Sequence, residues 1–309
     1  MKITIVGAGN VGATCAMRIL ESGIADVILL DVAESLAKGK AEDLMDCASV
    51  IEHGRQIIGT SDYSYTAESS IVVITAGFPR QPGMTREELL QRNSSIVKEV
   101  AGKLKDYSKN PIIIVVTNPL DVMSFMVYKW SRLDYKRVIG MAGVLDSSRM
   151  NLMVARALNK TLTGIGSLVL GTHGETMVPA VSHSKVDGIK LRDMLEPKMI
   201  DDLISKTKNR GAEIISYIKH GSAFYAPSAG VFKMVKAIVE NTHEILPCSC
   251  LLHGEYGIND VYLGVPAKLC RDGLEEVVEL PLSQDEKKLL RESATSVRKN
   301  IDSITNKPV

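Results

Sequence analysis

Short apolar stretches alternate with longer amphipathic stretches through the first half of the chain. Five apolar stretches end in glycine, aspartate or proline, and they cover residues 2–9, 26–31, 70–77, 110–119 and 136–143. The segments between them carry apolar residues at helical spacing, as in residues 10–23, 36–50 and 87–108. Buried strands that alternate with helices are typical of a parallel sheet covered on both faces. We therefore predict an α/β fold in which residues 1–142 form a Rossmann-type, doubly wound domain.

The second half of the chain, residues 143–309, has a less regular pattern. Helical spacing predicts helices over residues 147–159, 198–220 and 226–241 and from Ser283 onward. Ser283 and Glu286 have the spacing of a capping box at the start of the last helix. Strands are predicted over residues 163–170 and within 248–282. This mixture predicts a second α+β domain, the catalytic and substrate domain, that shares a broad interface with the first.

A glycine motif follows the first strand. The sequence GAGNVG places Gly7, Gly9 and Gly12 in G-x-G-x-x-G spacing between a strand and a helix. Such glycines permit a tight turn, a close approach of backbone to a pyrophosphate and close packing of helix on strand. Asp31 ends the second strand, where its carboxylate would accept hydrogen bonds from ribose hydroxyls and repel a 2′-phosphate. The motif predicts NAD as cofactor in preference to NADP; the alternative is an ordinary turn that binds nothing.

The stretch AGFPRQPGMTREELLQRN follows the third strand, and two of its three arginines, Arg80 and Arg86, are candidate site residues. Thr85 and Glu88 have capping-box spacing for the helix that follows. Arg86 then falls in the first helical turn, where the helix dipole disfavours a cation. This small conflict indicates that Arg86 has another task. Arg80 lies in the loop itself, where plain solvation is the alternative to a binding role.

Further polar residues lie at later strand ends, where open parallel sheets bind ligands. Asn118 ends the strand in VVTNPLD, and a turn residue is the alternative reading. In GVLDSSRMNLM, Asp146 is predicted to be a helix N-cap with Arg149 one turn later. In LVLGTHGETMVP, His173 follows an apolar run, and a plain turn histidine is the alternative.

Together these stretches resemble the lactate/malate dehydrogenase family. The resemblance extends nearly from end to end, and within the family it is closest to the malate dehydrogenases built on the lactate dehydrogenase pattern. The motifs that carry it, in chain order, are ITIVGAGNVG, LLD, TAGFPRQPGMTREELLQRN, TNPLDVM, VIGMAGVLDSSRM, GTHGETMVP, GSAFYAP and GVP.

The resemblance implies a role for each polar residue of the second group of motifs. His173 is the expected acid/base of hydride transfer, and Asp146 is the carboxylate that orients it. Arg149 is expected to bind the substrate's C1 carboxylate, and Arg86 to polarise the reacting carbonyl. Arg80 stands at the loop position where the malate enzymes have arginine and lactate enzymes usually have glutamine.

The resemblance also implies the cofactor contacts. Asn93 and Asn118 stand where the family contacts cofactor and substrate, and Glu175 stands where many relatives have aspartate after His-Gly. The expected NAD-binding set is Gly7, Ala8, Gly9, Asn10, Val11, Gly12, Asp31, Asn93, Val116, Thr117 and Asn118.

The chemistry of the residues fits one substrate best. An imidazole titrates near neutrality, so His173 suits proton transfer to a ketone oxygen. Two arginines that each hold a carboxylate, Arg149 and Arg80, imply a four-carbon dicarboxylic 2-oxo acid, oxaloacetate, and its reduced form malate. A lactate dehydrogenase or another 2-hydroxy acid dehydrogenase is the alternative within this chemistry. A catalytically silent NAD-binding scaffold is the alternative from another class.

Composition narrows the remaining classes. Hydrophobic residues make up 45% of the chain and charged residues 24%, as in a globular protein with a sizeable core. The net charge of +1 offers no field for nucleic acid or a membrane surface. Five cysteines without metal-ligand spacing predict neither a disulfide framework nor a metal site, and Cys248 and Cys250 are expected to be buried thiols of one strand. No signal peptide is recognised, so a cytoplasmic location is expected, and the family resemblance implies a homodimer or homotetramer.

Overall fold

The computed structural model describes residues 1–78, 83–219 and 221–305. Its helices are α1 Asn10–Glu21, α2 Glu34–Ile51, α3 Arg86–Tyr107, α4 Leu120–Ser131, α5 Gly143–Ala157, α6 Leu191–Met194, α7 Pro197–Ile218, α8 Tyr225–Val239 and α9 Gln284–Thr305. Its strands are β1 Lys2–Val6, β2 Asp26–Leu30, β3 Ile57–Thr60, β4 Ile71–Ile74, β5 Ile112–Val115, β6 Val138–Gly140, β7 Ile165–Gly166, β8 Val169–Gly171, β9 Met177–Pro179, β10 Lys185–Val186, β11 Ile189–Lys190, β12 Ile245–His253, β13 Asn259–Cys270 and β14 Gly273–Val277.

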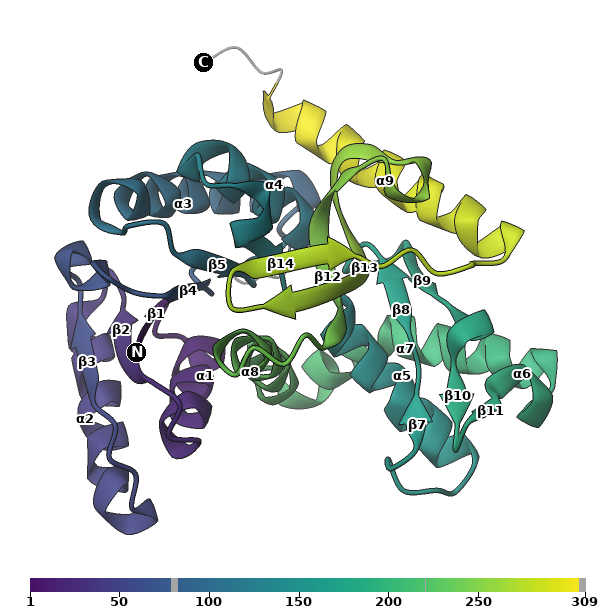
Figure 1. Cartoon of the computed structure of the whole chain (residues 1–309), viewed down its shortest axis with the longest axis horizontal. Helices are drawn as coiled ribbons and strands as arrows, with labels where there is room; N and C mark the ends of the chain where they lie inside the picture. Colours follow the sequence, from purple (N-terminus) through teal and green to yellow (C-terminus); the bar gives the residue numbers. More distant parts are fainter. Residues whose placement is uncertain (79–82, 220, 306–309) are drawn as a thin grey trace.

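One large sheet runs through both halves of the chain (Figure 1). Its first part has the order β3-β2-β1-β4-β5-β6 and is parallel throughout. Strands β12, β13, β8 and β9 continue it with antiparallel pairing, and β14 pairs with β13. The junction lies where Ser249 of β12 pairs with Gly140 of β6. Backbone pairing therefore joins the two halves, in addition to side-chain packing.

Helices cover both faces of the parallel part. Figure 1 shows α3 and α4 on one side of the sheet and α1 with α8 on the other. The strands between them are mostly apolar and buried, as at Ile5, Ile74 and Ile114. Strands buried on both faces have no polar side to expose, which explains their continuous apolar runs. The predicted α/β fold, a Rossmann-type sheet followed by an α+β second half, is confirmed.

The sequence reading overlooked strand β3. Its apolar run is short, and Ile58 points outward with 45% of its surface exposed, so the segment lacks the continuous burial of its neighbours. At Gly59 a Cβ would lie 2.3 Å from the backbone oxygen of Ala37 in α2, so only glycine fits between strand and helix. The segment therefore carries a glycine where periodicity requires an apolar residue.

Two local predictions in the second half were wrong. Helix α5 begins at Gly143, so Asp146 lies within its first turn and the N-cap position belongs to Ala142. The carboxylate of Asp146 binds other side chains and caps no backbone N–H. The single strand expected over 163–170 is divided, because β7 belongs to a small separate sheet with β10 and β11 while β8 joins the large one.

Other local predictions are confirmed. Thr85 and Glu88 form a capping box at α3, and Ser283 and Glu286 form one at α9. Cys248 and Cys250 are buried, unpaired thiols of strand β12.

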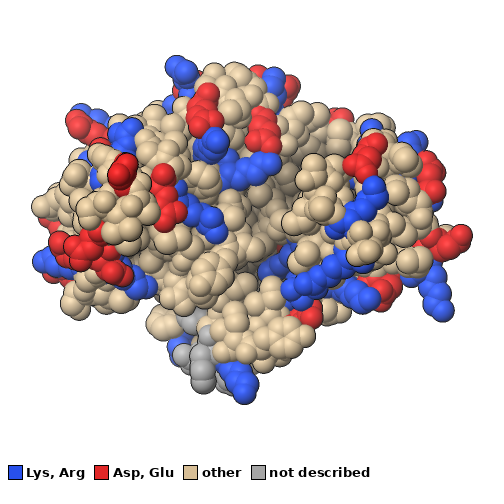
Figure 2. Space-filling model, turned by 90° about the horizontal axis from the view of Figure 1, so that it is seen from below, with Lys and Arg blue, Asp and Glu red and all other residues tan. Residues whose placement is uncertain are grey.

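The surface of the molecule carries charges of both signs. In the face drawn in Figure 2, Lys and Arg side chains border a hollow near the middle, and acidic side chains lie mostly toward the edges. Among the helices within the described ranges, none is both long enough and apolar enough to cross a membrane.

Candidate active site

The glycine turn between β1 and α1 has the geometry of a phosphate cradle. Gly7 has a φ of +109°, and a Cβ there would lie 2.6 Å from Oγ1 of Thr75. A Cβ on Gly12 would lie 1.9 Å from the backbone oxygen of Gly7, so helix and strand meet too closely for any side chain. A Cβ on Gly9 would meet nothing within 4 Å, so the turn is open at the helix N-terminus. Open space beside free helical N–H groups suits a diphosphate.

Asp31 extends from the end of β2 to this turn. Its Oδ2 accepts a hydrogen bond from the backbone N of Ala8 at 2.6 Å, and its Oδ1 accepts one from Ala33 N at 2.9 Å. Lys40 of α2 donates to the backbone oxygen of Ala8 at 2.8 Å. The carboxylate is thus fixed beside the glycine turn by two backbone donors, and it keeps lone pairs for further donors.

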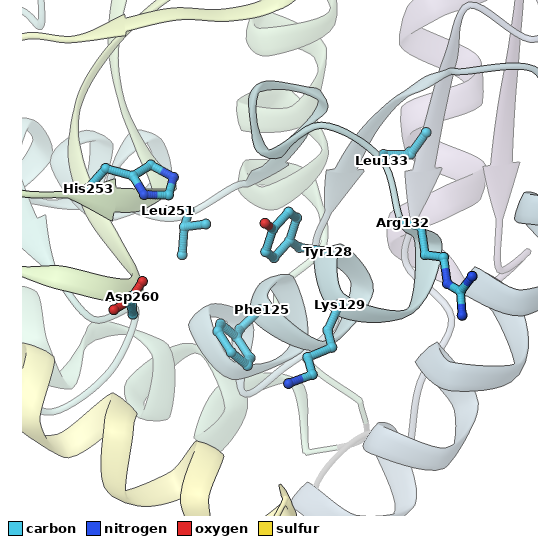
Figure 3. Close-up of a pocket in the computed structure, with 8 residues that line it drawn as sticks. All are labelled: Phe125, Tyr128, Lys129, Arg132, Leu133, Leu251, His253 and Asp260. Carbon is cyan, nitrogen blue, oxygen red and sulfur yellow. The ribbon is translucent and has the colours of Figure 1, made fainter.

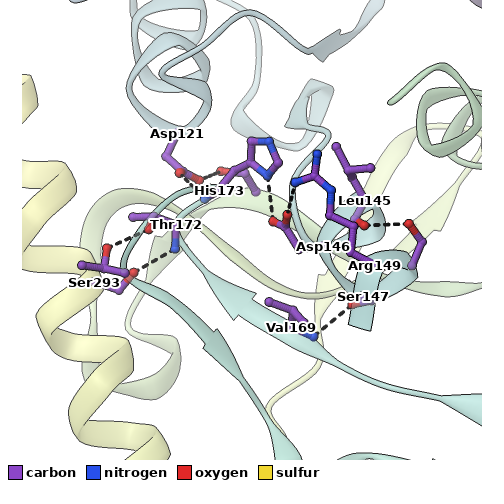
Figure 4. Close-up of polar contacts among 12 residues, drawn as sticks. Asp121, Leu145, Asp146, Ser147, Arg149, Val169, Thr172, His173 and Ser293 are labelled. Atoms are coloured by element: carbon purple, nitrogen blue, oxygen red, sulfur yellow. Dashed lines mark hydrogen bonds and ion pairs between the residues drawn. The ribbon is translucent and has the colours of Figure 1, made fainter. Parts of the chain in front are cut away.

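His173, Asp146 and Arg149 lie together at the junction of α5 and the segment after β8 (Figure 4). Nδ1 of His173 is 2.7 Å from Oδ2 of Asp146, and Arg149 donates to Oδ1 of the same carboxylate at 3.3 Å. Asp146 is 1% exposed, so both contacts are shielded from water. A carboxylate accepts only, so Nδ1 carries the proton and Nε2 is the nitrogen left for a substrate.

The surroundings of His173 favour its protonated form. Burial alone would lower the pKa of His173, but the neighbouring Asp146 carboxylate outweighs burial, so the pKa lies above its usual 6.5. Asp121 adds to the rise and Arg149 opposes it. A ring whose pKa is raised holds its proton to a higher pH than a free imidazole does, which favours proton donation.

Arg149 is a largely buried cation with unused hydrogen-bonding capacity. Burial lowers its pKa, and the nearby Asp146 carboxylate offsets part of that effect. Its Nε is buried without a hydrogen-bond partner among the described residues. A guanidinium of this kind is suited to an anionic ligand that supplies acceptors on its free side.

Arg86 is placed at the edge of this site. It is the first residue of α3, and its guanidinium forms an ion pair with the Glu175 carboxylate, two residues beyond His173. Both side chains are largely exposed, at 69% and 77%. The carboxylate of Glu175 therefore faces Arg86. Arg80, the predicted substrate selector, lies outside the described residues.

The side chain of Asn93 contacts the backbone of Asn118, and not its side chain. The Asn93 side chain is 1% exposed, and its Nδ2 donates to the backbone oxygens of Asn118 at 2.6 Å and Phe78 at 3.2 Å. Its Oδ1 accepts from Phe78 N at 2.7 Å. Asn93 thus ties the loop after β4 to the loop after β5, while the Asn118 side chain is exposed.

Val116 and Thr117 also lie in the segment after β5. Both are buried, and Oγ1 of Thr117 donates to the Ala76 backbone oxygen at 2.7 Å. Contacts from these two residues to a cofactor would come from their backbone.

The sequence reading missed the residues that hold the His173 segment. Asp121 of α4 accepts a hydrogen bond from His173 N at 3.0 Å, and Ser293 of α9 accepts one from Thr172 N at 2.8 Å. Ser147 of α5 accepts from Val169 N at 2.9 Å. A lone Asp in a first helical turn and two serines in helices give no signal of such contacts, because serines are common on helix surfaces.

A separate pocket lies away from this site (Figure 3). It is lined by the second half of α4, by the start of the segment that follows, and by the ends of β12 and β13 near the turn between them; its residues are Phe125, Tyr128, Lys129, Arg132, Leu133, Leu251, His253 and Asp260. It contains none of the predicted site residues.

Comparison with known proteins identifies the family. Residues 1–140 match the model of the lactate/malate dehydrogenase NAD binding domain, and residues 143–307 match that of the lactate/malate dehydrogenase alpha/beta C-terminal domain. The malate dehydrogenase of Chlorobium chlorochromatii (strain CaD3) is 48% identical over 301 residues, which is 97% of each chain.

Solved structures agree with the sequence matches. The malate dehydrogenase of Cryptosporidium parvum superposes with a TM-score of 0.96 at 37% identity, covering 99% of both chains. The lactate dehydrogenase of the same organism, complexed with lactic acid and the dinucleotide cofactor, superposes with a TM-score of 0.96 at 36% identity, covering 99% of this chain and 98% of that one. The fold alone therefore does not separate the two activities.

The glycine turn and the histidine–carboxylate pair together define a dehydrogenase that uses a nicotinamide cofactor. Within that class, the chain belongs to the lactate/malate dehydrogenase family, and its first 140 residues are the family's NAD binding domain.

Proposed function

We propose that the chain is an NAD-dependent malate dehydrogenase, which transfers hydride reversibly between (S)-malate and oxaloacetate. The observation that carries the proposal is the buried contact of 2.7 Å between Nδ1 of His173 and Oδ2 of Asp146. His173 donates a proton to the ketone oxygen in reduction and accepts it back in oxidation. Asp146 holds the ring in one tautomer and stabilises the imidazolium.

Two arginines complete the reacting end of the site. Arg149 binds the C1 carboxylate, which supplies the acceptors that its buried guanidinium lacks. Arg86 stabilises the negative charge that develops on the carbonyl oxygen in reduction. Because Arg86 is paired with Glu175 at the exposed edge of the site, it has to leave that partner as the substrate is enclosed.

The residues at the glycine turn fit NAD. The open space at Gly9 is a cradle that a Cβ would fill, and Asp31 is fixed beside it. Gly7–Gly12 and the backbone of Val116–Asn118 would hold the diphosphate and nicotinamide ends, and Asp31 the ribose. When bound, NADH supplies the hydride. Asn93 would act on the cofactor through the two loops that it joins.

The choice of malate over lactate rests on Arg80, which would pair with the second carboxylate of oxaloacetate. The curated relatives at 46–48% identity are malate dehydrogenases, which supports this choice. One assay tests it: NADH oxidation is measured side by side with oxaloacetate, with pyruvate and without substrate. We expect oxaloacetate to be preferred. A preference for pyruvate indicates lactate dehydrogenase, and no oxidation with either indicates a silent NAD-binding scaffold.

We further propose that residues 1–142 form the NAD-binding domain and that residues 143–309, which carry Asp146, Arg149 and His173, form the catalytic and substrate domain. The protein is proposed to be a homodimer or homotetramer. Apolar side chains exposed on helices support this, such as Val50 of α2 at 80% and Tyr225 of α8 at 66%. Light scattering coupled to gel filtration measures the state, and a monomer would contradict it. The cytoplasmic location stays a prediction.

A further inference from the structure

Asp121 is a buried carboxylate that the proposed reaction does not use. It lies in the first turn of α4, and only 4% of it is exposed. Its Oδ2 accepts a hydrogen bond from the backbone N of His173 at 3.0 Å, and its Oδ1 accepts one from the hydroxyl of Ser249 at 2.7 Å (Figure 4 shows the first). Neither lysine nor arginine among the described residues forms an ion pair with it.

Asp121 lies where three parts of the chain meet. Helix α4 follows the last residues of the predicted cofactor loop, Ser249 lies on β12 where the two halves of the sheet meet, and His173 follows β8. A buried carboxylate costs several kcal/mol unless hydrogen bonds or an opposite charge compensate it. A protonated His173 ring nearby supplies an opposite charge that offsets part of this cost.

We propose that Asp121 is a positioning residue for His173: it fixes the backbone N–H of His173 and supplies a second negative charge that favours the protonated ring. The proposal rests on the proposed function of His173 as acid/base. The charged groups that act on the ring within the described residues are Asp146 and Arg149 from α5 and Asp121 from α4. Asp121 therefore supplements Asp146, on the backbone side of the same residue.

Burial and hydrogen bonds have opposite effects on the ionisation of Asp121. Burial raises the pKa of Asp121 to about 6, and the hydrogen bonds from Ser249 and from His173 N hold it below the value that burial alone would give. Loss of the Ser249 hydroxyl would thus make the neutral form of Asp121 more common near pH 7. The charge on Asp121 depends on both of its hydrogen-bond donors.

A second backbone anchor provides the contrast. Ser293 of α9 is fully buried and accepts from Thr172 N at 2.8 Å, so it holds the residue just before His173 without any charge. Ser249 is equally buried. Ser293→Ala and Ser249→Ala therefore remove comparable hydroxyls, but only the second change touches the carboxylate.

The test is the pH profile of kcat/KM for oxaloacetate reduction in four variants of the full chain. Asp121→Asn has nearly the same shape, and its amide can still accept from His173 N while its NH2 donates to Ser249. We expect the midpoint of the fall with rising pH to move down by about 0.5–1 unit, because a nearby negative charge is lost. The KM for NADH should stay unchanged. Ser249→Ala should move the midpoint in the same direction by less.

Two controls accompany these variants. Glu286→Gln removes a buried carboxylate that binds Ser182 and not His173, so its midpoint should stay at the wild-type value. Ser293→Ala should lower kcat without moving the midpoint. An unmoved midpoint in Asp121→Asn, or in Ser249→Ala if Asp121→Asn does not fold, overturns the proposal. So does an equal shift in Ser293→Ala. A failure of the proposed function is seen separately, as normal turnover in His173→Asn.

Discussion

The proton transfer is assigned to a single side chain, and its loss should be selective. In His173→Asn the ring is removed while the cofactor turn is untouched. We expect turnover to fall by at least about 10²-fold, the lower range for a positioned acid/base, with NADH binding nearly intact. His183→Asn is the matched control, since the His183 ring lies outside the site and its Nε2 hydrogen-bonds the Pro281 backbone oxygen. Near-normal turnover in His173→Asn would remove this residue from the mechanism.

The raised pKa of His173 also fixes the direction of the pH dependence. Reduction needs the protonated ring, so its kcat/KM should be constant at low pH and fall as pH rises through the raised pKa, above 6.5. Malate oxidation needs the neutral ring and should rise over the same range. Opposite limbs with a common midpoint are expected. A reduction profile that rises with pH would show that the ring is not the donor.

At the residue scale, Arg80 is the proposed selector of the substrate. Oxaloacetate brings a second carboxylate that needs a cation in a water-poor site, and pyruvate brings a methyl. Losing one partner of a desolvated charge pair costs roughly 2–5 kcal/mol, so in Arg80→Gln the kcat/KM for oxaloacetate should fall by about 30-fold or more. Pyruvate should gain less. The control is Arg271→Gln, in the exposed turn between β13 and β14. If the substrate ratio moves by less than about threefold, Arg80 is not the selector.

Asp31 should set the preference for NAD. Asp31→Ser removes the acceptor beside the glycine turn and the repulsion against a 2′-phosphate. We expect weaker NADH binding and a smaller ratio of NAD to NADP in kcat/KM. Asp26→Ser is the control, because Asp26 lies at the opposite end of the same strand and binds Gln56 N. A ratio unchanged from wild type would show that Asp31 does not distinguish the ribose.

At the scale of elements, two glycines of the β1–α1 turn have different expected roles: Gly12 in stability and Gly9 in cofactor binding. Gly12→Ala puts a Cβ 1.9 Å from a backbone oxygen and should destabilise the protein by about 1–3 kcal/mol. Gly9→Ala meets no protein atom within 4 Å, so its melting temperature should match wild type. The same Cβ occupies the phosphate cradle, and NADH affinity should fall by about tenfold, 1.4 kcal/mol, or more. Thermal melts and NADH titrations of both variants measure this. Unchanged affinity in Gly9→Ala would place the diphosphate elsewhere.

At the scale of the whole molecule, the continuous sheet predicts cooperative unfolding. The β6–β12 junction and the Asp121 contacts cross between the halves that match the two family models. Separation of the halves would leave β6 and β12 without their pairing at the junction and would break the contacts around His173. We therefore expect one calorimetric transition. NADH should move the whole transition upward, since a ligand that binds only the native state stabilises every part coupled to it. Two transitions, or a shift of only part of the signal, would show that the halves unfold independently.

The sequence by itself determined the parts that depend on local patterns. Continuous apolar runs fixed the buried parallel strands, glycine spacing fixed the β1–α1 turn, and the Thr85–Glu88 pair fixed the start of α3, because each is set by residues a few positions apart. The edge strand β3 escaped because its burial is incomplete and Gly59 interrupts its pattern. The family motifs predicted that Asp146 orients His173, although 27 positions separate the two residues.

Only the tertiary structure decided how His173 is held. His173 lies 52 positions from Asp121, Ser249 lies 128 from Asp121, and Ser293 lies 121 from Thr172. No periodicity links residues at such separations, and a buried aspartate or serine reads in sequence like a helix cap or a solvated side chain. These contacts form because the sheet is continuous across the two halves of the chain and brings α4, α9 and β12 close to the His173 segment. Hydrogen bonds made by that closure exist only in the folded chain.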